Sequence, residues 1–221
     1  MFGPYSCVVL DGVERLTDLL VRRAGYPSVV AAVAEHAIFL DPETVAQTGG
    51  SALFSTIRMR NVSERGSIGE VDGRRVLLDD NTSPTDAFLW AAGIQRSEVR
   101  EMQFNHVWTA SRDPDAYTAL WNICATPAFL AKTTDGNNHP EVIAALRFHA
   151  YRLYGLVPEG MPVPNEPTYY RELRWAPHPD AVSDLAETVI DRLRRTPKSR
   201  TTTACREIGW LFSEWAPDAT L

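Results

Sequence analysis

Gln103-Phe104-Asn105-His106-Val107-Trp108 is the stretch that decides how this chain is expected to fold and work. Its extended pattern predicts a short strand that carries a histidine, the side chain best suited to proton transfer near pH 7. The clearest helix of the chain begins downstream at His139-Pro140 and ends before Gly155. We therefore expect the working part of the protein to lie between Gln103 and Tyr154.

Outward from this stretch, helical patterns dominate. The periodicity of the residue pattern changes in Ile68–Leu78. Together with Asp72-Gly73 this change predicts a β-hairpin with a type I′ turn. After it, Ser83-Pro84 is expected to cap a helix. The expected helices lie at residues 11–24, 29–39, 42–48, 85–92, 128–133, 140–154, 179–195 and 204–215.

These elements predict a mainly helical α+β fold. We divide it into an N-terminal helical part (1–67), a central part that holds the histidine (68–155) and a C-terminal helical part (156–221), which together form one compact unit. The boundary near 156 rests on the proline-rich, aperiodic residues 156–169.

The composition is that of an ordinary folded protein of 221 residues, with a net charge of −6 and a pI near 5.4. No apolar run is long enough for a membrane span, and the first residues do not resemble a secretion signal. Cys7, Cys124 and Cys205 are widely spaced, which argues against a disulfide scaffold or a cysteine-rich zinc site. We expect a cytoplasmic protein without a membrane partner.

The histidine stretch, followed by Asn122 sixteen residues after His106 and then by a helix, resembles the HNH or His-Me finger nucleases over roughly residues 103–135. The resemblance implies a ββα-metal-like unit that holds a divalent metal ion, with Mg²⁺ favoured. It implies that His106 is the general base that activates water, that Asn105 is a metal ligand, and that Asn122 fixes the loop. A neutral imidazole can deprotonate water near pH 7, and a metal ion offsets the charge that develops on a phosphate.

The sequence departs from this family where a helix residue should bind the metal. Ala131 stands nine positions after Asn122, and the alternatives are Asp135 and His139. Asp79-Asp80-Asn81, at the end of the hairpin, is a second source of ligands, because carboxylates at a strand end often hold hard cations. Alternatively, these side chains bond nearby backbone amides in a turn.

Two further side chains of this segment allow more than one interpretation. His106 could be a half-buried core residue with a satisfied hydrogen bond. Cys124 could be a nucleophile paired with His106, but a lone cysteine in an apolar run is more often a small buried hydrophobic residue.

Basic residues gather in two islands of the sequence. The C-terminal island predicts contacts to phosphates, and a second group lies between Arg58 and Arg75; either could instead be a solvated surface. The predicted nucleic-acid contacts are Arg192, Arg194, Arg195, Lys198 and Arg200.

The sequence thus predicts a metal-dependent endonuclease that hydrolyses DNA, in a restriction or defence setting. A homodimer is expected of an enzyme that cuts two strands. One alternative, which Ala131 favours, is a catalytically inactive nucleic-acid- or protein-binding module on a degenerate HNH-like scaffold. The other is a helical interaction protein with no nucleic-acid link, which the acidic pI favours.

Overall fold

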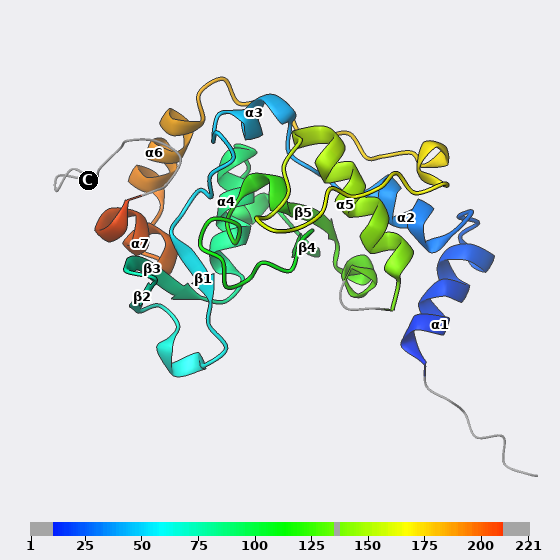
Figure 1. The fold of residues 1–221 in the computed structure, drawn as a ribbon, viewed down its shortest axis with the longest axis horizontal. Helices are drawn as coiled ribbons and strands as arrows, with labels where there is room; N and C mark the ends of the chain where they lie inside the picture. The colour runs from blue at the N-terminus through cyan, green and yellow to red at the C-terminus, as the bar shows by residue number, and fades with distance from the viewer. Residues whose placement is uncertain (1–10, 135–137, 210–221) are drawn as a thin grey trace, which may run out of the picture.

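The computed structural model describes residues 11–134 and 138–209 and confirms the α+β class (Figure 1). Helices surround two small sheets, one of three strands and one of two. Asp135, one of the predicted metal ligands, and the last residues of the helix expected at 204–215 lie outside the described residues. No helix within them has the length and apolar character needed to cross a bilayer.

Three short helices open the described chain. α1 (Gly12–Thr17) continues directly into the π-helical turn η1 (Asp18–Arg23), and together they correspond to the single helix expected at residues 11–24. α2 (Val29–His36) is largely buried, as its apolar sequence predicts, and α3 (Pro42–Ala46) follows. α2 ends three residues before its expected end, because Ile38 leaves the helix and exchanges two backbone hydrogen bonds with Ala125.

The predicted hairpin forms part of a three-stranded sheet. β2 (Ile68–Val71) and β3 (Arg74–Asp79) are antiparallel, and β1 (Thr56–Arg58) pairs with β3 in parallel. The turn residues Asp72 and Gly73 have φ of 50° and 77°, the positive values that a type I′ turn requires.

The histidine strand belongs to the second sheet. β4 (Met102–His106) pairs antiparallel with β5 (Ile123–Pro127), and His106 lies opposite Ile123. The hairpin and the histidine strand are therefore in different sheets. A 3₁₀ helix, η5 (Ala128–Thr133), follows β5 in place of the expected α-helical turn.

Most of the remaining α-helices differ from expectation at their starts, and the last helix also ends early, at Ile208 in place of residue 215. α4 (Thr82–Ala91) begins three residues early, because carboxylates at the end of β3 accept hydrogen bonds from its first amides. α5 (Pro140–Tyr154) ends at Gly155 as predicted, with φ of 70° there. α6 (Leu185–Arg195) starts six residues late, at its cap Asp184, and α7 (Arg200–Ile208) starts four residues early. The other short helices are η2 (Val62–Glu64), η3 (Arg96–Glu98), η4 (Leu120–Asn122) and η6 (Tyr170–Glu172).

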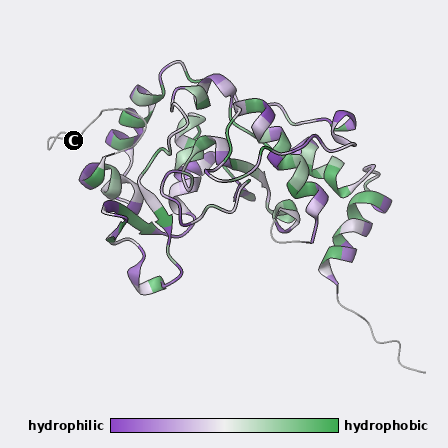
Figure 2. Cartoon of the chain, in the orientation of Figure 1, coloured by the Kyte–Doolittle hydropathy of each residue, from purple (hydrophilic) through white to green (hydrophobic). Residues whose placement is uncertain are grey.

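One hydrophobic core runs from Leu20 in η1 to Cys205 in α7. α2 packs against α5, and both α6 and α7 pack against α4. In Figure 2 most helices carry both hydrophobic and hydrophilic residues, as expected of helices that cover a core. Residues from all three sequence parts thus share the core.

Candidate functional site

His106 is the last residue of β4, and its ring stacks on Tyr117 with the ring centroids 4.9 Å apart. Its Nε2 lies 2.8 Å from the backbone oxygen of Tyr117. A carbonyl oxygen only accepts hydrogen bonds, so Nε2 carries the proton and Nδ1 keeps its lone pair. Burial lowers the pKa of His106, although the bond to Tyr117 opposes this. The imidazole is therefore neutral near pH 7, with Nδ1 able to accept a proton.

Asn122 lies completely buried just before β5. Its Oδ1 accepts a hydrogen bond of 2.7 Å from the backbone N–H of Trp108, and its Nδ2 donates one of 2.9 Å to the oxygen of Ala116. These bonds tie the two ends of the loop after His106 to one another. Such contacts are what the resemblance implies for a loop-fixing asparagine.

Asn105 precedes His106 in the strand, so its side chain lies on the opposite face of the sheet. Its Nδ2 donates to the hydroxyl of Thr126 at 2.8 Å. Opposite it, Cys124 is fully buried, and burial raises the pKa of its thiol to about 12. The thiol stays protonated at neutral pH, as expected of a small buried hydrophobic residue.

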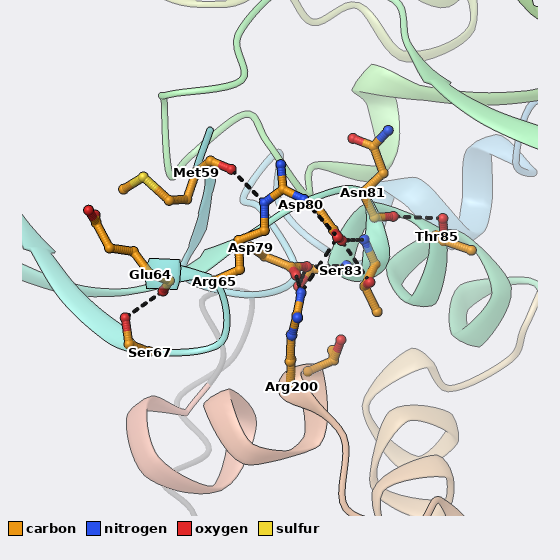
Figure 3. A network of polar contacts seen from close by, with 12 residues as sticks. Met59, Glu64, Arg65, Ser67, Asp79, Asp80, Asn81, Ser83, Thr85 and Arg200 are labelled. Carbon is orange, nitrogen blue, oxygen red and sulfur yellow. Dashed lines mark hydrogen bonds and ion pairs between the residues drawn. The ribbon is translucent and has the colours of Figure 1, made fainter. Parts of the chain in front are cut away.

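Asp79, the last residue of β3, lies fully buried beneath the start of α4. Its Oδ2 accepts hydrogen bonds of 2.6 Å from both the backbone N–H and the hydroxyl of Ser83. Its Oδ1 forms an ion pair of 3.5 Å with Arg200. Figure 3 shows Arg200 reaching from the start of α7 to this carboxylate.

Asp80 joins the same network from the surface side. Its Oδ1 accepts hydrogen bonds from the N–H and hydroxyl of Thr82, and its Oδ2 forms ion pairs with Arg65 and Arg200 at 3.6 and 3.5 Å. Burial alone would raise the pKa of Asp80, but the bonds from Thr82 and the two arginines outweigh it and lower the pKa. Both carboxylates are thus bound to protein cations and amides.

The predicted metal ligands do not fit a metal centre in the described residues. Asn105 faces away from His106, and Asp79 and Asp80 already hold Arg200 between them. Within residues 11–134 and 138–209, no three His, Cys, Asp or Glu side chains gather closely enough to hold a metal ion. Ala131, in the family's ligand position, is buried. We therefore derive no chemical step through a metal.

His106 does line a surface pocket of about 390 Å³ beside the start of α5. Arg147 of α5 lines the same pocket, with its guanidinium carbon 5.0 Å from the centre of the Trp108 ring and its Nε donating to the oxygen of Val107. A neutral imidazole and a guanidinium thus share one opening. His139, the alternative ligand, bonds Glu141 at the start of α5.

A second, larger feature gathers basic side chains into a groove. Three pockets meet at Arg96, which lines all of them, and Thr82 lines two. We call these three adjoining pockets together the basic groove. Its cations are Arg58, Arg65, Arg96, Arg192, Arg195 and Lys198.

The five predicted nucleic-acid contacts divide into three groups. Arg192, Arg195 and Lys198 line the basic groove. Arg200 pairs with the buried and half-buried carboxylates described above, and Arg194 is exposed and lines none of the three pockets. Arg96, at the centre of the groove, lies outside both basic islands of the sequence, so the sequence analysis missed it.

Carboxylates pair with three of the six groove cations. Arg65 pairs with Asp80, which itself lines the groove, at 3.6 Å. Arg96 pairs with Asp86 at 3.0 Å, and Arg195 pairs with Asp191 at 2.9 Å within α6. Arg192 donates to the oxygen of Gly93. The side chains of Arg58 and Lys198 have no ion-pair or hydrogen-bond partner in the part of the chain that the structure describes.

Compared with known proteins, the chain matches no family model, no curated protein and no solved structure.

Proposed function

We propose that this protein binds nucleic acid through the basic groove. The observation that carries the proposal is the convergence on Arg96 of cations from two distant parts of the sequence, Arg58 and Arg65 on one side and Arg192, Arg195 and Lys198 on the other. On a chain of net charge −6, such a local excess of positive charge favours a polyanionic ligand.

The chemistry of the groove suits a phosphate backbone. Arginine presents a planar fork of donors that matches phosphate oxygens, and lysine adds a mobile point charge. Hydroxyl side chains also line the groove, and hydroxyls commonly contact phosphates. These hydroxyls belong to Thr82, Thr85, Ser97, Thr196 and Ser199. Those of Thr82, Thr85 and Ser199 already donate hydrogen bonds within the protein.

A salt titration with a matched pair of variants tests the proposal. We expect labelled single- and double-stranded oligonucleotides to bind the wild type, with affinity that falls steeply as salt is added. The double variant Arg58→Gln/Lys198→Gln removes the two unpartnered cations, one from each side of the groove. We expect it to bind about tenfold or more weakly and to lower the slope of log K against log salt by about two.

The control is Arg60→Gln/Arg194→Gln, which removes the same charge from exposed side chains that line none of the three pockets. Fluorescence anisotropy at several salt concentrations measures both variants. An equal loss in the two double variants would show a diffuse charge effect and contradict a groove.

A second candidate function is phosphodiester hydrolysis in the His106 pocket. The geometry that favours it is the neutral imidazole whose Nδ1 has no hydrogen-bond partner among the described residues, next to the guanidinium of Arg147. His106 would act as the general base, and Arg147 would bind the phosphate. Asn122 would act as a positioning residue through the loop.

Cleavage assays separate the two candidates. Both the wild type and His106→Ala are incubated with plasmid and with single-stranded DNA in the presence of Mg²⁺, Mn²⁺ or EDTA. We expect the wild type to cleave DNA. We expect His106→Ala to lose cleavage while it keeps its circular dichroism spectrum and its DNA affinity. Equal cleavage by both proteins would rule out His106 as the base. Binding without any cleavage would contradict this second candidate and leave the binding proposal standing.

A further inference from the structure

The largest of the three pockets in the basic groove, about 530 Å³, is built unlike the others. α4 and η3 form one wall, and the end of α6 with the start of α7 forms the other. The volume lies within the roughly 300–1,000 Å³ of small-molecule sites, whereas a backbone-tracking surface needs only a shallow groove.

This pocket combines a cationic wall with an apolar one. Leu89, Trp90 and Ile94 supply the apolar part. Arg192, Arg195 and Lys198 lie on the other wall, and Arg96 lies on the same wall, where it pairs with Asp86, the one carboxylate in the lining. A ligand that suits both walls carries a strongly charged group next to a flat, apolar ring.

Trp90 adds a directional feature to the apolar wall. The residue is only 5% exposed, and Phe54 holds its ring edge-on with the centroids 5.3 Å apart. In the described residues its indole N–H has no hydrogen-bond acceptor, and it is not among the polar atoms that are sealed from solvent. A ligand in the pocket can supply that acceptor.

We infer that this pocket binds a nucleotide through a terminal phosphate group, a phosphomonoester, with the base against Leu89 and Trp90. The inference rests on the proposed function, because it names what one part of the same groove recognises. A phosphodiester inside a strand carries one negative charge, whereas a phosphomonoester carries close to two at pH 7 because its second pKa is about 6. Asp86 and Asp191 each pair with one arginine, whereas Arg192 bonds only a backbone oxygen and Lys198 has no partner among the described residues. The positive charge that remains matches the more highly charged group.

Two sources supply this chemistry, a phosphorylated strand end and a free mononucleotide. Oligonucleotides of one sequence with a 5′-phosphate, a 3′-phosphate or only hydroxyl ends, together with free AMP and GMP, distinguish them. We expect the wild type to bind one phosphorylated oligonucleotide about tenfold more tightly than the hydroxyl form, as charge-assisted hydrogen bonds are the strong ones. If free nucleotide displaces that oligonucleotide at a similar concentration, the source is the mononucleotide.

Three variants place the preference in the pocket. Lys198→Gln removes the unpartnered cation, and Trp90→Phe removes only the indole N–H while it keeps an aromatic ring. Both should reduce the preference for the phosphorylated form to less than about threefold. Arg194→Gln, on the same helix as Arg192 but outside the pocket, should retain the full preference.

The outcomes also separate this inference from the proposed function. Equal affinity for phosphorylated and hydroxyl forms in the wild type would overturn the inference and leave groove binding intact. Absence of binding to every oligonucleotide and nucleotide would overturn both. A preference that survives in Lys198→Gln and Trp90→Phe, with both proteins folded, would place the phosphate elsewhere and overturn the inference.

Discussion

The unit around His106 and the basic groove use their polar side chains in opposite ways. In the first, Asn122 is fully buried, and its side-chain amide accepts one hydrogen bond from, and donates another to, backbone groups of the loop that it closes. In the second, Lys198 and Arg58 are both exposed, and neither side chain has a partner among the described residues. Polar groups whose hydrogen bonds are all used inside the fold stabilise it, whereas unpaired cations remain free to bind a ligand.

Among the substitutions that test this contrast, removal of the Asn122 amide should change the free energy of unfolding most. We expect Asn122→Ala to lower the free energy of unfolding by about 2–4 kcal/mol, because it leaves a buried N–H at Trp108 and a buried oxygen at Ala116 without partners. Urea denaturation monitored by circular dichroism measures the change.

Asn81→Ala is the matched control for this experiment. Asn81 precedes α4 in an exposed position and makes no side-chain capping bond, so its substitution should change the free energy of unfolding by less than about 0.5 kcal/mol. Equal stabilities for the two variants would show that the loop does not depend on its asparagine.

The parts of the fold that could be predicted depend on local chemistry. Asp72-Gly73 takes the positive φ values of a type I′ turn, and Gly155 ends α5, because few other residues tolerate those backbone angles. One boundary that was wrong depends on a distant partner. Ile38 leaves α2 to bond Ala125, a contact that no local pattern reveals.

A smaller effect concerns the protonation of His106. Burial lowers its pKa below the 6.5 of the unfolded chain, so between the two values the unfolded state binds a proton that the folded state does not. The stability this provides is complete above pH 6.5 and is lost as the pH falls through the folded pKa. One such proton contributes a slope of at most about 1.4 kcal/mol per pH unit.

Urea denaturation between pH 5 and 7 for the wild type and His106→Gln would reveal that slope. The glutamine amide can still donate to the oxygen of Tyr117 but does not titrate, so its stability should fall less steeply in acid. His149, whose pKa burial lowers to about 3, adds the same dependence to both proteins and cancels from the difference. Parallel curves would show that folding does not shift the pKa of His106.

The candidate site was predictable in residue type more than in arrangement. The sequence marked Asp79, Asp80 and Arg200 for separate tasks, as metal ligands and as a phosphate contact, and the fold joins them in one ion-pair network. Long-range packing of α7 against β3 decides that pairing. Arg96 lies outside both basic islands of the sequence, and only the shared lining of three pockets shows its central place.

The smallest expected effect is the response of stability to the loss of groove cations. Arg58→Gln/Lys198→Gln should change the free energy of unfolding by less than about 0.5 kcal/mol, because neither side chain has a partner to lose in the described part of the chain. Any change should be a gain, since the substitutions reduce repulsion with Arg65, Arg96 and Arg195, and the gain should vanish in 1 M salt, where the screening length is about 3 Å. Urea denaturation at low and high salt measures it beside Arg60→Gln/Arg194→Gln. A loss of 2 kcal/mol or more, similar to that expected for Asn122→Ala, would mean that these cations hold the fold together and would remove the contrast between the two regions.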